Sequence, residues 1–309
     1  MKIHYGLNNN LNIPNPIVTT GTFDGVHIGH RKIIERLKSL AVENNGETVV
    51  ITFEPHPRLV LFPDDSGLVL LSTMDEKQEL LRKAGIDHLI IIPFTKEFSR
   101  FSSNEWINML VENLFLHTLV IGYDHHFGRN REGSIEQLKQ FSKELEFNLE
   151  EIPAQDIDDI RVSSTKIRQA LKEGDIKSAN IFLQYPYSFT GTVVEGDKRG
   201  RTIGYPTANL KIADPLKLVP ADGVYAVNVW VDNKMFPGML NIGLRPTVDE
   251  KKHTIEVHIF NLEQDLYGKL ITLQLMTKIR NEKKFESIDA LKSQLDNDAM
   301  VAMNDLKEA

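Results

Sequence analysis

Strand-like and helix-like segments alternate along the first 184 residues of this sequence. The run at 48–53 is rich in β-branched residues, as buried strands are, and it follows a stretch in which apolar residues recur at helical spacing. Two later helices are expected to begin with capping boxes, at Thr73 with Glu76 and at Ser102 with Glu105. Repeated strand–helix units of this length predict a parallel sheet with helices on its faces, and such sheets bind ligands at the carboxyl ends of their strands.

Strand-like segments separated by turn formers dominate after residue 184. This pattern predicts a small, mostly antiparallel barrel. The chain then closes with one amphipathic helix, for which Ser287 is the expected N-cap. We therefore predict two domains, residues 1–184 and 185–309, with the boundary at Tyr185-Pro186. The expected strands of the two domains are 16–20, 48–53, 89–93, 118–122, 188–195, 224–231, 239–242, 254–260 and 270–276.

Composition places the chain among ordinary globular proteins and excludes several classes of site. Its 309 residues suffice for two domains, and 41% of them are hydrophobic and 26% charged. There is no cysteine, so disulfides, thiolate metal sites and cysteine nucleophiles are excluded. The net charge of −7 argues against a nucleic-acid partner, and neither a secretory signal nor a membrane-spanning run is found. We expect a cytoplasmic protein, and the sequence carries no signal of its oligomeric state.

The sharpest local motif is GTFDGVHIGH at residues 21–30, directly after the first strand. Gly25 and Gly29 can let a phosphate approach the backbone, and the helix that follows offers unpaired N–H groups and a positive dipole end. His27 and His30 are three residues apart, so both can project from one side of a helix start. Two imidazoles there suit the stabilisation of charge on a reacting phosphoryl group. The alternative is a tight turn with two capping histidines.

A second motif, VSSTKIR at residues 162–168, opens a helix that carries Ile167. Ser163 or Ser164 is a natural N-cap, and capping alone would explain the motif. The alternative adds Arg168 and the hydroxyls as a second phosphate clamp, because a guanidinium fork matches phosphate oxygens.

In the second domain, a Gly- and Arg-rich loop runs into Pro-Thr-Ala-Asn at residues 206–209. An exposed basic hairpin loop would have this composition. The alternative is a nucleotide flap, in which Thr207 and Asn209 offer oxygen ligands to a hard cation such as Mg²⁺.

Glu256 lies in an alternating run at residues 254–260. Period two places the apolar residues of this run on one face and Glu256 with His258 on the other. On a half-exposed strand such polar residues are usually solvated.

Four motifs of the first domain together resemble the adenylyltransferase half of bacterial bifunctional riboflavin kinase/FAD synthetases: residues 21–30, 52–57, 122–128 and 162–168. The resemblance implies a Rossmann-like nucleotidyltransferase of the HIGH superfamily, with His27 and His30 as catalytic residues. The family commonly has Phe after the Asp or Asn of the motif at 122–128, whereas His125 follows Asp124 here. The flavin-binding residues that the resemblance implies are His56, Pro57 and Arg58. The ATP-binding residues that it implies are Gly21, Thr22, Phe23, Asp24, His27, His30, Asp124, Ser164, Thr165 and Arg168.

The second domain resembles riboflavin kinases in the same way. The segments 223–226, 241–247 and 267–269 follow residues 206–209 in the order of that family. The resemblance makes Glu256 the expected general base, which accepts the proton of the riboflavin 5′-hydroxyl. The ATP-binding residues that it implies for the kinase are Gly196, Gly200, Arg201, Gly204, Thr207 and Asn209, of which Thr207 and Asn209 are the expected metal ligands.

The resemblance covers nearly the whole chain and implies two reactions that use ATP with Mg²⁺. Riboflavin would be phosphorylated to FMN, and FMN would be adenylylated to FAD with release of pyrophosphate. Three alternatives stay open. In the first, one half has lost its activity, and His125 points to the first half. In the second, the chain is a non-catalytic regulator that binds a flavin or a nucleotide. In the third, Lys198, Arg199 and Arg201 bind RNA, which the negative net charge disfavours.

Overall fold

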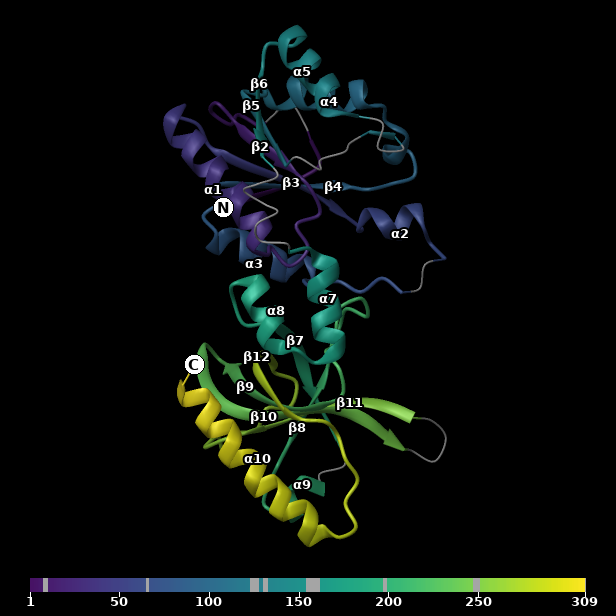
Figure 1. Cartoon of the computed structure of the whole chain (residues 1–309), viewed down its shortest axis with the longest axis vertical. Coiled ribbons are helices and arrows are strands. Elements are labelled where there is room, and N and C mark those ends of the chain that lie inside the picture. The colour runs from purple at the N-terminus through teal and green to yellow at the C-terminus, as the bar shows by residue number, and fades with distance from the viewer. Residues whose placement is uncertain are drawn as a thin grey trace. The chain divides into compact units, whose positions relative to one another are not determined.

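The chain forms two compact units, Met1–Ser164 and Thr165–Ala309, which Figure 1 shows in a single view. The second unit takes in α8 (Ile176–Leu183) and all but the first residue of α7 (Ser164–Glu173), which precede the predicted boundary at Tyr185-Pro186. That boundary stays a prediction. The computed structural model describes residues 1–7, 11–64, 67–122, 128–129, 133–153, 162–196, 199–246 and 251–308, with 199, 244–246, 251, 252 and 308 described by their backbone alone.

The first unit is built on a six-stranded sheet, whose strands are β1 (Lys2–Tyr5), β2 (Ile17–Thr20), β3 (Thr48–Glu54), β4 (His88–Pro93), β5 (Thr118–Gly122) and β6 (Asn148–Ile152). Every neighbouring pair is parallel, so the predicted parallel sheet is confirmed. The strand order is β1-β4-β3-β2-β5-β6, with β3 and β4 on one side of β2 and β5 and β6 on the other. In such a sheet a ligand crevice opens where the order reverses, here at the carboxyl ends of β2 and β5.

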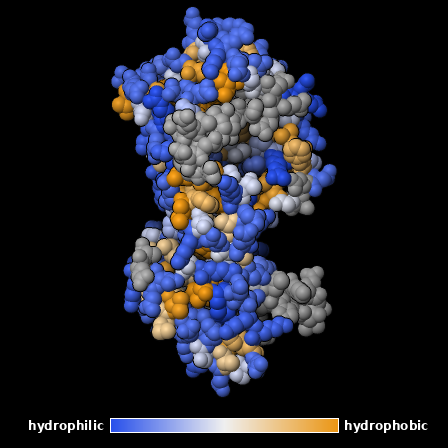
Figure 2. All heavy atoms as spheres, viewed as in Figure 1, coloured by the Kyte–Doolittle hydropathy of each residue, from blue (hydrophilic) through white to orange (hydrophobic). Residues whose placement is uncertain are grey.

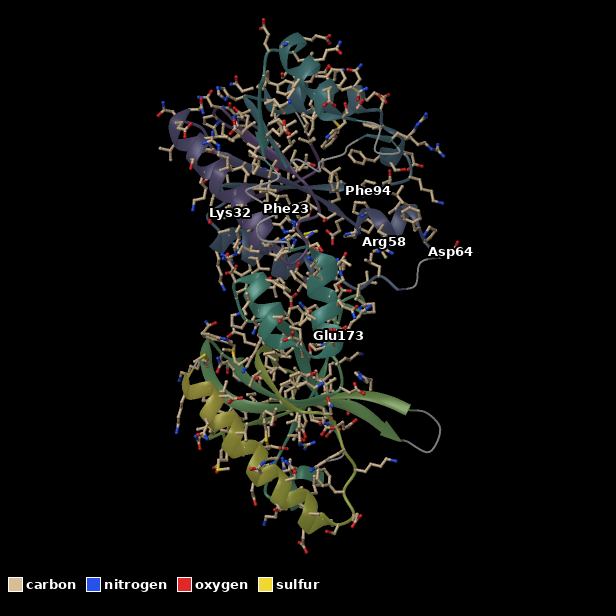
Figure 3. The ribbon with its side chains drawn as sticks, in the orientation of Figure 1. Phe23, Lys32, Arg58, Asp64, Phe94 and Glu173 are labelled. Atoms are coloured by element: carbon tan, nitrogen blue, oxygen red, sulfur yellow. The ribbon has the colours of Figure 1, made fainter. Side chains whose placement is uncertain are left out.

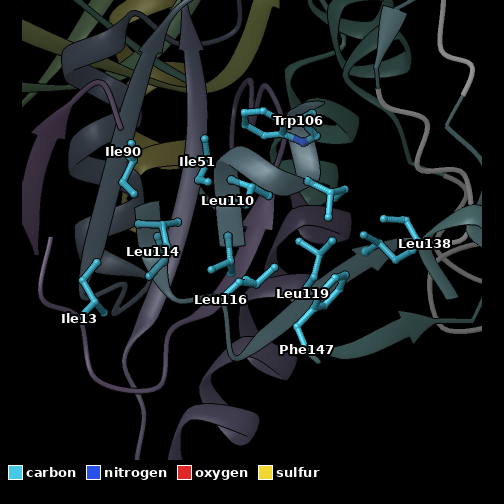
Figure 4. Close-up of a cluster of buried hydrophobic side chains, with 14 of the residues drawn as sticks. Ile13, Ile51, Ile90, Trp106, Leu110, Leu114, Leu116, Leu119, Leu138 and Phe147 are labelled. Carbon is cyan, nitrogen blue, oxygen red and sulfur yellow. The ribbon is translucent and has the colours of Figure 1, made fainter. Parts of the chain in front are cut away.

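Helices cover both faces of this sheet: α1 (Ile28–Glu43), α3 (Met74–Lys83), α4 (Ser103–Leu114) and α5 (Ile135–Glu144). Val49 and Ile51 of β3 belong to the apolar cluster under α4 and α5 (Figure 4). Val50, between them, belongs to the cluster under α1 and α3 on the opposite face. Because successive strand residues point to opposite faces, a sheet covered on both sides needs apolar residues at every position.

Both predicted capping boxes are confirmed, and they set where α3 and α4 begin. The Thr73 hydroxyl accepts a hydrogen bond from the backbone N–H of Glu76 at 3.2 Å, and the Glu76 carboxylate accepts one from the Thr73 N–H at 3.0 Å. Ser102 and Glu105 make the same reciprocal pair. The short edge strands β1 and β6 have no comparable local signal, and the sequence pattern does not predict them.

The second unit is a closed barrel of antiparallel strands: β7 (Ser188–Val194), β8 (Ala208–Lys211), β9 (Gly223–Val231), β10 (Lys234–Pro246), β11 (Lys251–Ile259) and β12 (Leu270–Arg280). The predicted barrel is confirmed, and so is the N-cap of the last helix, α10 (Ile288–Glu308), because the Ser287 hydroxyl accepts a hydrogen bond from the Ala290 N–H at 3.1 Å. The four-residue strand β8 is not predicted by its own sequence.

A buried ion pair ties α10 to the barrel. Arg280 of β12 donates from Nε and Nη2 to Oδ2 of Asp298, at 2.9 and 2.7 Å. Asp298 is fully buried, and its other oxygen accepts a hydrogen bond from Gln294 at 2.7 Å. A carboxylate removed from water is stable only when it is paired and hydrogen-bonded. The pair therefore fixes α10 against the barrel.

The visible surface is mostly hydrophilic, with apolar side chains in small groups (Figure 2). Among the described residues, no helix has the length and apolar character needed to cross a membrane.

Replacing Asp298 with Asn should destabilise the second unit by about 3–5 kcal/mol, because the Arg280 charge then stays largely buried without its counter-charge. Urea unfolding followed by circular dichroism measures the change. Asp289→Asn, at an exposed position in the first turn of the same helix, is the matched control and should cost less than about 1 kcal/mol. Equal stability of Asp298→Asn and the unaltered protein would show that the pair does not anchor α10.

Candidate active sites

A cavity of about 1220 Å³ opens in the first unit. Its walls come from segments that follow β2, β3, β4 and β5, which meet at one edge because the strands are parallel. Phe23, Arg58 and Phe94, labelled in Figure 3, come from three of these segments. Pockets for a single small ligand commonly measure about 300–1,000 Å³. This cavity is therefore larger than is usual for one small ligand.

The loop between β2 and α1 has an unusual backbone. Phe23 and Val26 have φ angles of 47° and 38°, in the left-handed region that residues other than glycine seldom occupy, and Gly25 has φ of 76°. At a residue other than glycine such a conformation costs about 1–3 kcal/mol and persists where packing holds it. Phe23 and Val26 are both buried in the apolar cluster under α1 and α3. The loop is therefore preorganised before any ligand binds.

His27 and His30 line the cavity at the start of α1. Their rings stack with centroids 3.8 Å apart and planes 17° apart, and Phe23 packs against the His30 ring at 4.8 Å. His27 occupies the N-cap position but makes no capping hydrogen bond with its side chain, which counts against the interpretation as two capping histidines. His30 Nδ1 is buried and has no hydrogen-bond partner among the described residues.

Burial lowers the pKa of His30 well below the usual value of 6.5, and the positive charges of His27 and Lys77 lower this pKa further. At neutral pH the imidazole is therefore uncharged and has one N–H to donate. A nearby anion favours the protonated form of a histidine. His30 is thus set to gain a proton when a phosphate binds beside it.

Asp24 holds the loop against the segment that precedes α3. Its buried carboxylate accepts hydrogen bonds from the N–H groups of Leu71 and Ser72, both at 3.0 Å, and from the Ser72 hydroxyl at 3.3 Å. The N–H of Gly25 donates to the same hydroxyl at 3.0 Å, so it is already used within the protein. Asp24 therefore braces the loop, and its expected contact with ATP stays a prediction.

Three more of the predicted ATP-binding residues line the cavity, namely Gly21, Thr22 and Ser164. The hydroxyl of Ser164, the last residue of the first unit, donates to the backbone carbonyl of Asp24 in the β2–α1 loop at 3.2 Å. The hydroxyl thus contacts a loop distant in sequence. The contact of these residues with ATP stays a prediction.

The other predicted ATP-binding residues of this half lie elsewhere in the chain. Thr165 and Arg168 are on α7, within the second unit. Asp124 and the neighbouring His125 fall outside the described residues. The roles expected for them stay predictions.

One part of the cavity wall is aromatic. Phe53, Phe98 and Trp106 contact one another, with the ring centroids of Phe98 and Trp106 5.5 Å apart. Phe94 and Phe101 contact Phe98 and also line the cavity. Aromatic rings in this arrangement can receive a planar apolar ring system. These aromatic residues belong to none of the motifs recognised in the sequence, although three of them follow β4 at helical spacing.

The predicted flavin-binding residues His56, Pro57 and Arg58 line the same cavity. They open the short helix α2 (Pro57–Leu61), and His56 Nδ1 accepts a hydrogen bond from the Arg58 N–H at 3.2 Å. Phe62, just beyond this helix, lines the cavity and is 61% exposed, so a bound ligand would cover apolar surface here. Their contact with a flavin stays a prediction.

In the second unit, Glu256, Thr207 and Asn209 come together. Glu256 of β11 lies opposite Asn209 of β8 and opposite Asn241 of β10. The Thr207 hydroxyl donates to Glu256 Oε2 at 3.3 Å. Glu256 is only 7% exposed, so it is not one of the solvated residues that strand alternation favours. The physical reason is that β8 and the segment before it pair with β11, a contact that the local pattern does not show.

Two glycines permit close approach around this cluster. A Cβ at Gly196 would lie 2.1 Å from Nδ2 of Asn209. A Cβ at Gly200 would lie 2.1 Å from the carbonyl oxygen of Tyr205. Any side chain at either position would therefore displace the residues that carry the cluster.

Two further residues of the same loop were predicted to bind ATP in the kinase. Gly204 has φ of 88°, a conformation that favours glycine. Arg201 is exposed on the short helix α9 (Arg199–Thr202). The contacts of Gly196, Gly200, Gly204 and Arg201 with ATP stay predictions.

His258 and Tyr205 support the segment that carries Thr207. Nδ1 of His258 donates to the carbonyl oxygen of Pro206 at 2.7 Å, and the Tyr205 hydroxyl donates to Asp296 of α10. Burial and the hydrogen bond to Asp296 raise the pKa of Tyr205 to about 12, so its hydroxyl stays protonated. No chemistry was expected of His258 from the sequence, and this contact gives it a supporting position.

The donor set of this cluster fits a hard divalent cation. The Thr207 hydroxyl, the Asn209 amide and the Glu256 carboxylate all offer oxygen, which Mg²⁺ prefers. Mg²⁺ is usually held by one or two protein groups, with water and substrate phosphates completing its shell. Within the described part of the chain, no group of three or more His, Cys, Asp or Glu could hold a metal. The cluster thus suits Mg²⁺ that arrives with a nucleotide.

Comparison with known proteins matches each half of the chain to a protein family. Residues 11–166 match the sequence model of the FAD synthetase family, and residues 183–306 match that of the riboflavin kinase family. The bifunctional riboflavin kinase/FMN adenylyltransferase of Escherichia coli (strain K12) is 37% identical over 306 residues, which cover 98% of this chain and 97% of that protein. The protein of the same name from Listeria monocytogenes is 35% identical over 285 residues, covering 92% and 90%. This chain belongs to the bifunctional riboflavin kinase/FMN adenylyltransferase family.

A solved structure from Streptococcus pneumoniae shares the fold of this bifunctional family member. It is 31% identical with a TM-score of 0.88, and the match covers 98% of this chain and 99% of that one. It is described as a macrolide-efflux protein, and that description concerns the streptococcal protein. In the present member of the bifunctional family, the FAD synthetase match covers most of the first unit, and the riboflavin kinase match takes in the barrel and most of α10.

ATP binding at pH 6 should be accompanied by proton uptake, because a phosphate beside His30 raises a pKa that lies below 6.5 in the free protein. Titration calorimetry in two buffers of different ionisation enthalpy measures the uptake. His30→Asn should reduce it by up to about one proton. His253→Asn, at an exposed histidine of the second unit, is the control. Unchanged uptake in His30→Asn would show that His30 does not sense the ligand.

Proposed function

We propose that this chain phosphorylates riboflavin to FMN in its second unit and adenylylates FMN to FAD in its first unit, with release of pyrophosphate. The observation that carries the proposal is the presence of both family matches in one chain, which aligns over 92–98% of its length with bifunctional relatives that are 35% and 37% identical. Two separate candidate sites, one in each unit, support it. The substrates are riboflavin, FMN and ATP, and the proposed location is the cytoplasm.

In the first unit, a phosphate oxygen of FMN attacks the α-phosphorus of ATP in line. A bond forms between that oxygen and phosphorus, the bond from the α-phosphorus to the bridging oxygen breaks, and pyrophosphate leaves. This chemistry needs no covalent enzyme intermediate, so the protein contributes positioning and hydrogen-bond donors. We assign the donors to His27 and His30, beside the N-terminus of α1, where helices attract anions.

We assign the aromatic part of the cavity wall to the flavin ring of FMN. Phe53, Phe98 and Trp106 offer flat apolar surface, as a tricyclic ring needs. Arg58 and His56 line the same cavity and carry polar groups. With the phosphate groups of ATP near His30, the two substrates would lie in one cavity, as in-line attack requires.

In the second unit, we assign Glu256 as the base that accepts the proton of the riboflavin 5′-hydroxyl while the hydroxyl oxygen attacks the γ-phosphorus of ATP. The bond from the γ-phosphorus to the bridging oxygen breaks, and ADP leaves. An alcohol is a poor nucleophile, so a placed carboxylate is needed. Thr207 and Asn209 would hold Mg²⁺, which when bound neutralises charge on the phosphates. The Thr207 hydroxyl already orients the Glu256 carboxylate.

Incubation of the full chain with riboflavin, ATP and Mg²⁺, followed by chromatography, tests the proposal. Both FMN and FAD should form, and supplied FMN should give FAD directly. FMN alone, with no FAD, would favour the alternative in which only the kinase is retained. FAD from supplied FMN, with none from riboflavin, would favour a monofunctional FAD synthetase. Flavin binding without any ATP turnover would favour a regulator.

Replacing His30 with Ala should lower FAD formation from supplied FMN by about 100-fold or more, the usual effect of removing a donor to developing charge. FMN formation from riboflavin should persist, because Glu256 and Thr207 lie in the other unit. Initial rates of the two reactions, measured separately, decide the outcome. His253→Ala is the matched control for histidine removal. Equal loss of both activities in a folded His30→Ala protein would contradict two separate sites.

Replacing Glu256 with Gln should lower FMN production by roughly 100-fold or more, because Gln keeps the hydrogen bond from Thr207 but cannot take a proton. Riboflavin binding, followed by fluorescence quenching, should change little, since proton transfer matters mainly in the transition state. Glu263→Gln, at an exposed position of the same unit, is the control. Near-normal FMN production by Glu256→Gln would remove Glu256 from the mechanism.

A further inference from the structure

Lys77 of α3 is a buried lysine behind the β2–α1 loop. It is 6% exposed, and its Nζ donates to the Thr52 hydroxyl at 3.3 Å. That hydroxyl donates in turn to the backbone carbonyl of Thr22 at 3.2 Å. Two hydrogen bonds therefore connect the ammonium group of Lys77 to the backbone of a residue that lines the cavity.

A charge in this position is costly to maintain. Lysine is almost never fully buried unless it is paired. Burial lowers the pKa of Lys77, while the negative charges of Asp24 and Glu54 oppose that effect. An apolar side chain of similar length, such as Met, would fill the space under the loop without desolvating an ammonium group. The chain instead keeps a cation beside Asp24, which itself braces the loop.

Lys77 lies outside the described cavity wall, but its charge acts on residues that line the cavity. Lys77 is not part of the described cavity wall, whereas Thr22 and His30 are. The positive charge of Lys77 contributes to the lowered pKa of His30, so its field reaches the histidine pair. An effect of Lys77 on a bound nucleotide must therefore pass through Thr52, Thr22 and His30, or through space.

We infer that Lys77 is a positioning residue for adenylyl transfer, which holds the Thr22 backbone through Thr52 and places a fixed positive charge behind the loop that receives the phosphates of ATP. This inference rests on the proposed adenylyltransferase function of the first unit. Displacing a positioning element by about 1 Å can lower a rate by about 100-fold. A fixed positive charge in a site of low polarity stabilises negative charge that develops on the phosphates.

The first test compares Lys77→Met with Lys83→Met, which removes an exposed lysine from the same helix. In Lys77→Met, the kcat for FAD formation from supplied FMN should fall by about 10-fold or more, while the KM for ATP changes by less than about 3-fold. Lys83→Met should behave as the unaltered protein. FMN formation from riboflavin should be unchanged in both variants, because the candidate kinase site lies in the other unit. Circular dichroism and thermal unfolding check that the first unit is folded.

A second readout separates the charge of Lys77 from a merely structural role. Removing that charge should raise the pKa of His30 in the ligand-free full chain, because Lys77 lowers it. Imidazole signals followed by NMR during a pH titration measure this pKa. Lys83→Met should leave it unchanged. A His30 pKa that does not move in Lys77→Met would overturn the inference.

Variants of Thr52 test the hydrogen-bonded route and do not require Lys77 to be altered. Thr52→Val removes the hydroxyl at constant shape, and Thr52→Ser retains it. Thr52→Val should lower the kcat for FAD formation by about 10-fold, Thr52→Ser by less than about 3-fold. In the double variant with Lys77→Met, the loss should be smaller than the product of the two single losses, because both act on Thr22.

The outcomes distinguish this inference from the proposed function. If the unaltered chain makes no FAD from FMN, the proposed adenylyltransferase function fails. If it makes FAD and folded Lys77→Met does so at the same kcat, the positioning role alone fails. If Lys77→Met does not fold, the Thr52 pair decides: equal rates in Thr52→Val and Thr52→Ser would overturn the inference, and a loss confined to Thr52→Val would support it.

Discussion

In both units of this protein, packing against the sheet or inside the barrel restricts where a ligand can bind. A parallel sheet with helices on both sides has no free face, so a ligand can reach it only at the strand ends. The reversal of strand order between β2 and β5 opens that edge, and the cavity lies there. The barrel is likewise closed to ligands in its interior, because side chains fill the inside of a small barrel. Its polar cluster accordingly uses Thr207, before β8, together with Asn209 of β8 and Glu256 of β11.

Each candidate site is held by residues that do not line it. In the first unit, Asp24 ties the β2–α1 loop to the segment before α3, and Lys77 contacts the loop through Thr52. In the second unit, His258 contacts the backbone before Thr207. Buried polar groups are expensive unless they are hydrogen-bonded. Hydrogen-bonded polar side chains of this kind surround both sites. A preorganised site requires them, because neighbouring residues must hold the groups that bind or react in fixed conformations.

The fold alone would not have identified the chemistry. One fold can host many unrelated activities, so a shared architecture by itself does not identify a reaction. The family matches supply the two reactions, and the geometry adds which groups are placed to take part. His30 lines the cavity as a neutral imidazole, and Glu256 lies buried beside a hydroxyl. These properties depend on surroundings that a motif does not contain.

Local patterns were enough to predict most of the longer helices and strands, the change to all-β structure, and the motifs that carry the histidine pair and Glu256. The capping box of Thr73 with Glu76 was predictable because it needs only residues three apart. Strand β8 was not, because a four-residue segment becomes a strand through its partners. The burial of Glu256 and the position of Lys77 behind Thr22 likewise arise from residues far apart in the chain. Sequence periodicity describes one element at a time, so contacts between distant elements appear only when the chain has folded.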